Sequence, residues 1–370
     1  MKILVTGGAG FIGSYLVDEL IKDGHSVRTY DSLEPQVHQG KIPDYLNKEA
    51  EFVQADINDV QSLDKALEGI DVVFHEAAMV GVGQSMYEII KYTKTNTLGT
   101  AVLLDLVVNK HRNHIKKLVV AASMSEYGEG LYSCSECGDI KPNLRYEEDM
   151  KKGNWDPFCP KCKKLLIPKR TPETTPLQCN SIYALNKRDQ EDMVLNIGKA
   201  FNIPVVALRY FNVFGPRQSL SNPYTGVAAI FLSRLKANHN PIVFEDGNQS
   251  RDFVSVHDIV SANIAVMKDD RANYQIFNVG SGKSISIGDV GKLLIKITES
   301  DQTLEIQNKY RKGDIRHCFA DISKIQKTID WQPQVDLEVG LKELIEWSKD
   351  KESEDFFEES QKILQAKGVV

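Results

Sequence analysis

Three glycines near the start of the chain, Gly7, Gly10 and Gly13, have the spacing G-x-x-G-x-x-G. An apolar segment, residues 2–5, precedes them, and a helical pattern of apolar residues follows. In such a loop the first glycine permits a tight turn, the second lets backbone N–H groups reach a pyrophosphate, and the third packs the helix against the strand. The sequence therefore predicts a strand, a phosphate-binding turn and a helix.

An acidic residue strengthens this prediction. Asp31 ends the next expected strand, eighteen residues after Gly13, which is the context that distinguishes a dinucleotide-binding loop from a structural glycine turn with a solvated aspartate. Its carboxylate can accept hydrogen bonds from both adenosine ribose hydroxyls. It would repel a 2′-phosphate by about 4 kcal/mol for one charge pair at about 4 Å near a protein surface. We therefore expect NAD rather than NADP.

Short apolar strands alternate with helical stretches along the first half of the chain, which indicates an α/β fold with a Rossmann-type, doubly wound parallel sheet. The expected later strands are 25–30, 51–55, 71–75, 117–122 and 204–208, and the clearest helices are 96–109 and 182–200. Beyond Gly215 the strands become fewer and irregular. We therefore expect an NAD-binding domain over 1–215 and a smaller, mainly substrate-binding C-terminal lobe over 216–370, of which about 245–270 returns to the first domain.

A second glycine-rich stretch, 280–284, resembles the end of a phosphate-binding loop of the Walker type. Such a loop needs a glycine five residues before Gly282, and that position is Phe277. We interpret 280–284 as a turn after a strand over 275–279.

Tyr183 and Lys187 are four residues apart on an expected helix, so they share one face. A free tyrosine, with a pKa of about 10, is a poor base at neutral pH. A neighbouring ammonium and a bound nicotinamide cation would favour its phenolate. Ser123 follows the fifth expected strand, at the sheet edge where ligands of this fold class bind. The three residues are predicted to form the catalytic group, with Lys187 also holding the nicotinamide ribose.

Four of the six cysteines form two close pairs. Cys134-x-x-Cys137 and Cys159-x-x-Cys162 have the spacing of a structural zinc site, and four thiolates would leave no open catalytic position. Disulfides or free thiols are the alternatives. The pairs fall within 130–172, which interrupts the strand–helix rhythm and which we interpret as a zinc-binding insertion.

Composition excludes several classes of protein. The chain has 370 residues, a formal net charge of −6 and 42% hydrophobic residues, as expected for a globular protein without a basic excess for nucleic acid. No apolar run approaches the roughly 18 residues of a membrane span. The apolar start is interrupted at once by Thr6 and the glycine loop, so no signal peptide is expected. We expect a cytoplasmic protein that binds neither membrane nor nucleic acid.

Together these motifs resemble the extended short-chain dehydrogenase/reductases that act on nucleotide sugars. The resemblance covers nearly the whole chain outside the insertion. It also rests on further segments, which are His75–Ala78, Gly81–Ser85, Ser123–Gly128, Arg209–Pro216, Arg251–Asp258 and Arg311–Arg316.

The resemblance implies roles for individual residues. Cofactor contacts are expected from Gly7, Gly10, Phe11, Ile12, Gly13, Asp31, Asp56, Ile57, Ala77, Asn96, Tyr183, Lys187 and Tyr210. Asp56 and Ile57 are expected at the adenine. Substrate contacts are expected from Ser125, Asn212, Arg251 and Arg311. The two guanidinium groups suit the oxygens of a nucleotide-sugar diphosphate.

Among the reactions of this family, the residues favour epimerisation. The family's dehydratases and decarboxylases resemble one another in carrying a glutamate two residues after the catalytic Ser or Thr, and that position is Ser125 here. Glu126 is one residue later, and on an extended segment it would face the other way. Asp31 disfavours the NADPH-dependent reductases. The expected cycle removes the proton of the sugar 4-OH and hydride from C4, lets the 4-keto sugar rotate, and returns hydride to its opposite face.

Within the family, the cysteine insertion, Arg209–Ser219 and Asn222–Gly226 are most similar to dTDP-L-rhamnose 4-epimerases, which make dTDP-6-deoxy-L-talose for surface polysaccharides. A 4-epimerase of the UDP-glucose/UDP-galactose type is the alternative, followed by a dehydratase or reductase. The basic run within 161–170 leaves a non-enzymatic NAD- or RNA-binding protein as the alternative from another class. Helices 96–109 and 182–200 resemble the family's dimer interface, so a homodimer is expected.

Overall fold

The structure is a computed structural model that describes residues 1–224, 226–311 and 313–368. Thr225 and Lys312, which belong to two of the motifs quoted above, lie outside the described residues.

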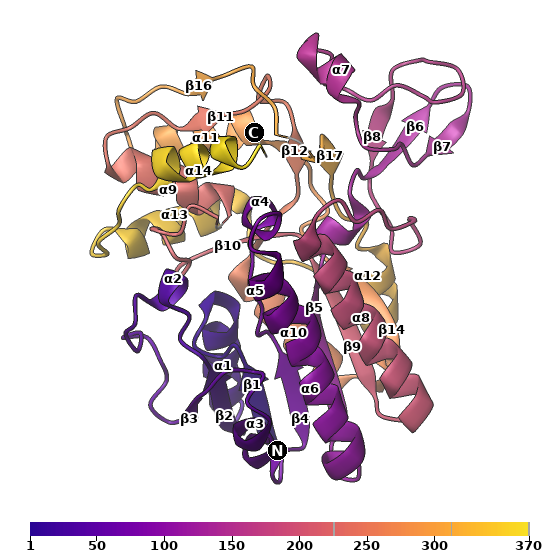
Figure 1. Cartoon of the computed structure of the whole chain (residues 1–370), viewed down its shortest axis with the longest axis vertical. Helices are drawn as coiled ribbons and strands as arrows, with labels where there is room; N and C mark the ends of the chain where they lie inside the picture. The colour runs from indigo at the N-terminus through magenta and orange to yellow at the C-terminus, as the bar shows by residue number, and fades with distance from the viewer. Residues whose placement is uncertain (225, 312, 369–370) are drawn as a thin grey trace.

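A parallel sheet forms the centre of the molecule (Figure 1). Within the described residues it has seven strands in the order β14-β9-β5-β4-β1-β2-β3. Their bounds are β1 Lys2–Thr6, β2 Ser26–Asp31, β3 Glu51–Gln54, β4 Val72–His75, β5 Lys117–Ser123, β9 Val205–Tyr210 and β14 Gln275–Val279. The expected α/β fold with a parallel, Rossmann-like sheet is confirmed.

The sheet has an apolar core on each face, because successive side chains of a strand point to opposite faces. Ile3 and Val5 of β1 belong to one core and Leu4 to the other. The first face is covered by α1 (Phe11–Lys22), α10 (Val256–Lys268) and α12 (Ser323–Ile329). The second is covered by α3 (Val60–Leu67), α6 (Gly99–Leu106) and α8 (Ile182–Phe201).

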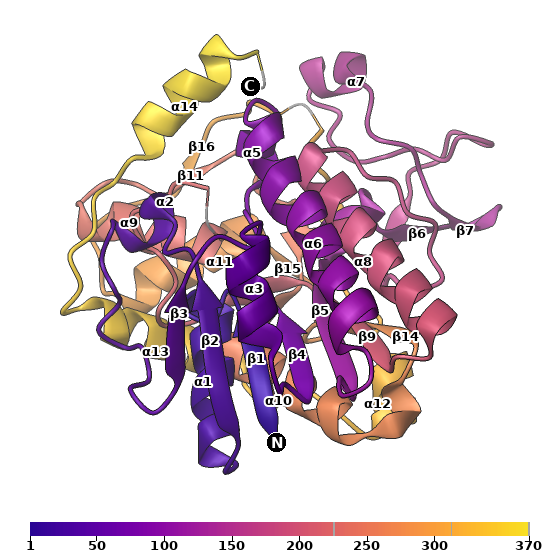
Figure 2. The ribbon, with the colours of Figure 1, turned by 60° about the horizontal axis from the view of Figure 1, so that its bottom comes forward.

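Helix α6 is one part of a longer continuous helix. It runs without a break through α5 (Ile89–Thr93), a π-helical stretch at Lys94–Leu98, α6 and a second π-helical stretch at Val107–His111. It packs beside α8 (Figure 2). The expected helices 96–109 and 182–200 are both present.

The chain beyond residue 215 builds a smaller lobe above the carboxyl ends of the sheet strands (Figure 1). Its helices are α9 Val227–Lys236, α11 Ile287–Ile297, α13 Leu337–Ser348 and α14 Phe357–Ala366. Its short strands are β11 Ile242–Val243, β12 Ser250–Arg251, β13 Phe253–Ser255, β15 Ile285–Ser286, β16 Glu305–Ile306 and β17 His317–Cys318. Strand β10, Asn212–Phe214, comes just before this part of the chain and pairs with β13. This part returns to the sheet at α10, β14 and α12, which is more than the expected 245–270; the functional division of the chain stays a prediction.

The insertion forms a small unit beside this lobe (Figures 1 and 2). It contains an antiparallel sheet in the order β7-β6-β8, with β6 Leu131–Cys134, β7 Gly138–Ile140 and β8 Ile167–Lys169, and the short helix α7, Glu147–Lys151. Of the helices in the described ranges, none is both long and apolar enough to cross a membrane.

Candidate active site

A cleft of about 610 Å³ lies at the carboxyl ends of the sheet strands, between the sheet and the smaller lobe. This is the edge at which ligands bind in parallel α/β sheets. Sixteen of the seventeen residues expected to contact cofactor or substrate line it: Gly7, Gly10, Phe11, Ile12, Gly13, Asp31, Asp56, Ile57, Ala77, Ser125, Tyr183, Lys187, Tyr210, Asn212, Arg251 and Arg311. Ser123 also lines the cleft, whereas Asn96 does not. The fold therefore brings almost the whole predicted set together.

The glycine loop lies at one end of the cleft and leaves no room for side chains. Gly7 has a φ of +69°, a conformation that favours glycine. A Cβ atom on Gly13 would lie 2.2 Å from the carbonyl oxygen of Gly7. The loop leads into α1, so backbone N–H groups face the cleft at a helix N-terminus. These features fit the pyrophosphate of a dinucleotide.

Asp31 is held in place by backbone groups. Its carboxylate accepts hydrogen bonds from the N–H groups of Ala9 at 3.0 Å and of Leu33 at 2.8 Å. The first of these ties the end of β2 to the glycine loop. Each carboxylate oxygen keeps a further lone pair for a ribose hydroxyl. His38, which the sequence analysis missed, also lines the cleft, with Nε2 4.0 Å from Asp31.

The predicted catalytic residues converge from β5 and α8. Burial raises the pKa of the Tyr183 hydroxyl to about 12, and its hydrogen bond with Ser123 acts against this rise. Lys187 Nζ donates to the carbonyl of Ala121 at 2.8 Å, which leaves two N–H groups for a ligand. Burial lowers the pKa of Lys187 to about 8. A tyrosine, a lysine and a serine thus meet in a water-poor part of the cleft.

The hydroxyl of Ser123 is oriented by its neighbours. Its oxygen accepts hydrogen bonds from the Ser125 hydroxyl at 2.9 Å and from the Ser125 N–H at 3.2 Å. Its own hydrogen is therefore left for the hydrogen bond with Tyr183, and a substrate oxygen that binds between the two hydroxyl groups can accept it instead. Ser125 is the residue expected at this substrate side, and it reaches the cleft next to Ser123.

Glu126 corrects one step of the sequence argument. The segment after Ser123 is a 3-10 turn, Met124–Tyr127, and not an extended strand. Glu126 is nevertheless directed away from the cleft, because its carboxylate accepts the Ser123 N–H at 2.9 Å and lies 3.6 Å from Arg209. The reason given from the sequence is wrong, while Glu126 is indeed absent from the cleft lining among the described residues.

Two arginines form the other end of the cleft. Arg251 is fixed by the carboxylate of Asp314 at 3.1 Å and by the Ile315 carbonyl at 2.7 Å. Arg311 lies over the ring of Phe244, with 4.0 Å from its guanidinium carbon to the ring centre. Its Nε is buried without a hydrogen-bond partner among the residues described. A buried guanidinium with an unused donor fits an anionic ligand.

Comparison with known proteins agrees with this site. Residues 3–152 match the NAD dependent epimerase/dehydratase family, and residues 167–344 match the GDP-mannose 4,6 dehydratase family. A dTDP-L-rhamnose 4-epimerase of Burkholderia thailandensis is 34% identical over 351 residues, which cover 94% of each chain. The chain belongs to the nucleotide-sugar epimerase family of extended short-chain dehydrogenase/reductases. It is therefore an isomerase, an NAD-dependent nucleotide-sugar 4-epimerase.

Solved structures of other epimerases share its fold. The UDP-glucose 4-epimerase of Thermotoga maritima, solved with UDP-glucose, has a TM-score of 0.76 and 32% identity and covers 94% of this chain and 98% of its own. The UDP-glucuronic acid 4-epimerase of Bacillus cereus, solved with UDP-glucuronic acid and NAD, has a TM-score of 0.74 and 28% identity over 94% of this chain and 99% of its own.

The epimerase cleft also holds a carboxyl group that sequence reasoning missed. Glu76 follows β4, lines the cleft and accepts a hydrogen bond from the Tyr210 hydroxyl at 2.8 Å. Asn263 in turn donates to the Tyr210 oxygen at 2.6 Å. Burial raises the pKa of Glu76 to about 7. Two signals were present in the sequence: Glu76 comes directly after a sheet strand, and it lies within the quoted segment His75–Ala78.

Asn96 has a different position in this epimerase from the other expected cofactor residues. It is buried and holds the backbone of Met79, accepting its N–H at 2.8 Å and donating to its carbonyl at 3.0 Å. Met79 lines the cleft. Asn96 thus fixes the loop after β4, and direct cofactor contact stays a prediction.

The second glycine-rich stretch is the expected turn. The Asp252 carboxylate accepts hydrogen bonds from the N–H groups of Ser281 at 2.7 Å and Gly282 at 2.9 Å. An internal carboxylate thus already occupies the position an anion would take. These bonds join the turn after β14 to the residue between β12 and β13.

The four paired cysteines meet at one point of the insertion. The Sγ atoms of Cys134, Cys137, Cys159 and Cys162 all lie within 4.8 Å of one another. All four are free thiols. Four thiol sulfurs at this separation have the donor set and the closeness that a tetrahedral zinc ion needs.

Proposed function

We propose that this epimerase converts dTDP-L-rhamnose into dTDP-6-deoxy-L-talose by inverting C4 of the sugar. The observation that carries the proposal is the single cleft in which the glycine loop, the Ser123–Tyr183–Lys187 group and the two arginines face one space. The choice of sugar is supported by the cysteine insertion and by the relative from Burkholderia thailandensis. Met79 packs with Tyr183 in one apolar cluster, and such surroundings suit the methyl group of a 6-deoxy sugar.

The residues present fit NAD. In the proposal the glycine loop holds the pyrophosphate, Asp31 the adenosine ribose, and Lys187 the nicotinamide ribose. When bound, NAD supplies the acceptor for hydride from C4 and the donor for its return.

The proton is handled by Tyr183 and Ser123. In the proposed step the Tyr183 oxygen takes the proton of the sugar 4-OH as the C4–H bond breaks. Ser123 donates a hydrogen bond to the same sugar oxygen and thereby keeps it in place. The Lys187 ammonium favours the ionised form of Tyr183, whose pKa burial raises to about 12. On the return of hydride the proton goes back from Tyr183 to the sugar oxygen.

Epimerisation also requires the sugar to turn over between the two hydride transfers. In the proposal Arg251 and Arg311 bind the diphosphate and do not hold the sugar, so the sugar is free to rotate. Asn212 lines the same part of the cleft, and its Oδ1 has no partner in the described part of the chain. A firmly held nucleotide and a loosely held hexose let the 4-keto sugar present either face.

The cysteine cluster is proposed to bind one structural zinc ion. Four thiolates complete its coordination, so the ion has no open position for a substrate. Its role is to hold β6, β7 and the 159–162 turn together in a unit whose apolar core is small.

A 4-epimerase of UDP-glucose or UDP-galactose is the second candidate, favoured by the solved structure from Thermotoga maritima with UDP-glucose. A purely RNA-binding role has less support, because Lys164 and Lys169 of the basic run form ion pairs with Glu136 and Asp139 of the same insertion.

We also propose a homodimer built on α5–α6 and α8. Leu98 and Leu185 on these helices are 49% and 45% exposed, respectively, and Ile90 is 82% exposed. Burying them against a second copy would remove an apolar patch from water. Sedimentation velocity should give a dimer mass, and Leu185→Glu should give a monomer.

The substrate is tested by proton NMR of the purified protein with dTDP-L-rhamnose and, in parallel, with UDP-galactose, without added NAD. A new anomeric signal with dTDP-L-rhamnose alone is expected. Tyr183→Phe should lower its rate by about 10²- to 10⁴-fold, the usual contribution of general acid–base catalysis. Conversion of UDP-galactose alone would replace the proposed sugar by the second candidate. No conversion of either, with NAD bound, would contradict both sugars.

A further inference from the structure

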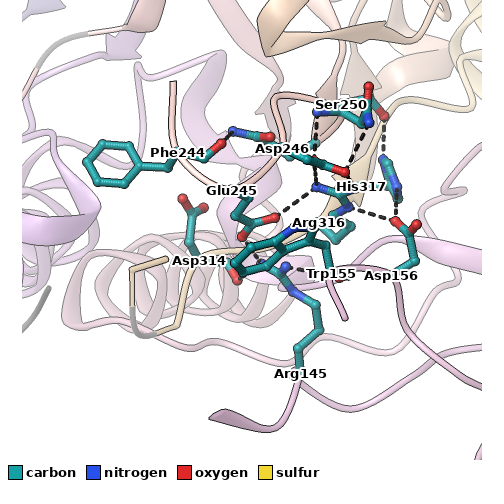
Figure 3. A network of polar contacts seen from close by, with 12 residues as sticks. Arg145, Trp155, Asp156, Phe244, Glu245, Asp246, Ser250, Asp314, Arg316 and His317 are labelled. Atoms are coloured by element: carbon teal, nitrogen blue, oxygen red, sulfur yellow. Dashed lines mark hydrogen bonds and ion pairs between the residues drawn. The ribbon is translucent and has the colours of Figure 1, made fainter. Parts of the chain in front are cut away.

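The cleft arginines depend on a segment that is held between the insertion and the smaller lobe. Residues 313–316 pass beside the insertion just before β17, and they supply groups that fix Arg251. A network of buried and half-buried charged side chains surrounds this segment (Figure 3). Asp314 and Arg316 belong to the Arg311–Arg316 segment quoted above, whereas the other charged members belong to none of the motifs that identified the cleft. These other members are Arg145, Asp156, Glu245 and Asp246.

Arg145, from the insertion, lies at one side of this network. Its side chain is 3% exposed, and its guanidinium donates to Glu245 Oε1 at 2.7 Å. It also donates to the carbonyl of Asp314 at 2.9 Å and to that of Trp155 at 3.1 Å. The planar fork of an arginine makes such simultaneous contacts possible. The Arg145 side chain thus connects the insertion to the residues that support Arg251 and to those that support Arg311.

The first connection leads to Arg251. Arg145 binds the backbone oxygen of Asp314, and the side chain of the same residue binds Arg251 at 3.1 Å. Asp314 lines the cleft. Its backbone position therefore decides where its carboxylate, and with it the Arg251 guanidinium, faces the cleft.

The second connection leads to Arg311. Glu245 accepts from Arg145, and its backbone N–H donates to the Lys309 carbonyl at 2.7 Å, two residues before Arg311. The neighbouring Phe244 carries the Arg311 guanidinium on its ring. Glu245 has a φ of +54°, a strained value for a residue with a Cβ, which its buried contacts hold in place.

Arg316 forms the other side of the network. It is 1% exposed and binds Glu245 at 2.9 Å, Asp246 at 2.7 Å and, in the insertion, Asp156 at 2.7 Å. Figure 3 shows Glu245 between the two guanidinium groups. The insertion thus holds the segment at two points, through Arg145 and through Asp156.

We propose that Arg145 is a positioning residue for diphosphate binding, by which the insertion sets the places of Arg251 and Arg311. This inference rests on the proposed function, because it takes the two arginines to bind the substrate diphosphate. Arg145 itself does not line the cleft. Its loss should weaken binding of the nucleotide diphosphate and leave the cofactor site, at the opposite end of the cleft, unchanged.

The test measures the binding of dTDP and of UDP to the NAD-loaded protein by calorimetry. Arg145→Gln should raise the Kd of the diphosphate by about 3- to 30-fold, the usual range of coupling through a packed network. The KM of the sugar substrate should rise with it, while kcat stays within about twofold. Arg145→Lys keeps the charge but not the fork, so its Kd should lie between the two.

Two further variants keep the test decisive if Arg145→Gln does not fold. Asp156→Asn removes the partly exposed partner of Arg316, and a smaller rise in Kd is expected. Lys169→Gln breaks an exposed ion pair of the same insertion and should leave the Kd unchanged. NAD content and circular dichroism report whether each variant is folded.

The outcomes separate the two proposals. Diphosphate binding that is unchanged in folded Arg145→Gln, or in both Arg145→Lys and Asp156→Asn, overturns the positioning role alone. Loss of NAD together with the diphosphate would show general damage and overturns it as well. A wild-type protein that binds neither dTDP nor UDP overturns the proposed function and this inference with it.

Discussion

The two ends of the cleft are built in different ways. At the end proposed to bind the cofactor (the cofactor end), the glycine loop and Asp31 lie within one strand–helix–strand unit, and the hydrogen bond from Ala9 to Asp31 spans 22 residues. At the end proposed to bind the diphosphate (the diphosphate end), Arg251 and Arg311 are supported by contacts between residues that are far apart in sequence. Arg145 reaches Glu245 across 100 residues and Asp314 across 169.

Because the two ends are built differently, different substitutions should weaken ligand binding at each. The cofactor end depends on backbone geometry, so steric changes within the loop should damage it directly. The diphosphate end depends on buried ion pairs, in which removal of one partner leaves the other charge uncompensated. A substitution that damages the insertion should therefore weaken diphosphate binding and leave NAD binding unchanged.

The largest effect is expected from Gly13→Ala, which breaks the cofactor end alone. The added methyl group would lie 2.2 Å from the Gly7 carbonyl oxygen, so the loop must move. We expect NAD affinity to fall by about 100-fold, the upper end of the cost of overpacking. Calorimetry with NAD measures it, and the Kd of dTDP is the internal control. Normal NAD binding would contradict the proposed cradle.

A smaller effect is expected from Cys159→Ser, which breaks the insertion. Metal analysis should show the loss of about one zinc ion per chain. The midpoint of thermal unfolding should fall by about 5 °C or more, and the Kd of dTDP should rise while NAD binding is kept.

Cys179→Ser is the matched control for this change, because Cys179 lies outside the cluster. Equal zinc content in the wild type and Cys159→Ser would contradict the metal site. Loss of zinc without any change in the Kd of dTDP would show that the metal site does not influence diphosphate binding.

The smallest effect is expected from Glu76→Gln, which tests how the stability of the fold depends on pH through a buried carboxyl group of the cleft. Burial raises the pKa of Glu76 to about 7, from an ordinary value near 4.5. Between these two pH values the folded protein holds a proton that the unfolded chain has released, so this group makes the fold less stable as pH rises.

Glutamine keeps the hydrogen bond to Tyr210 without this titration. Relative to the wild type, the variant should gain about 2–4 °C in unfolding midpoint when pH rises from 4.5 to 7.5. Differential scanning calorimetry across this range measures the difference. If the difference in unfolding midpoint between the variant and the wild type stays constant or falls as pH rises, Glu76 does not titrate in this pH range.

Much of the site could be predicted because its signals are local. The spacing of Gly7 and Gly13, and of Tyr183 and Lys187, fixes which groups share a turn or a helix face. Glu126 shows the limit of this reasoning, because no local pattern indicated that the segment after Ser123 forms a 3-10 turn. The Ser123 N–H and Arg209 hold the Glu126 carboxylate there, and Arg209 comes from a distant strand.

The parallel sheet, the candidate dinucleotide loop, the candidate catalytic group and the grouping of four cysteines could all be predicted from the sequence, because short-range spacing and position at strand ends govern each of them. The meeting of Arg145, Glu245 and Asp314 could not be predicted, since contacts between distant segments follow from packing and not from spacing. Buried charges have to find partners wherever the fold places them. The support of the diphosphate end is therefore visible only once the chain is folded.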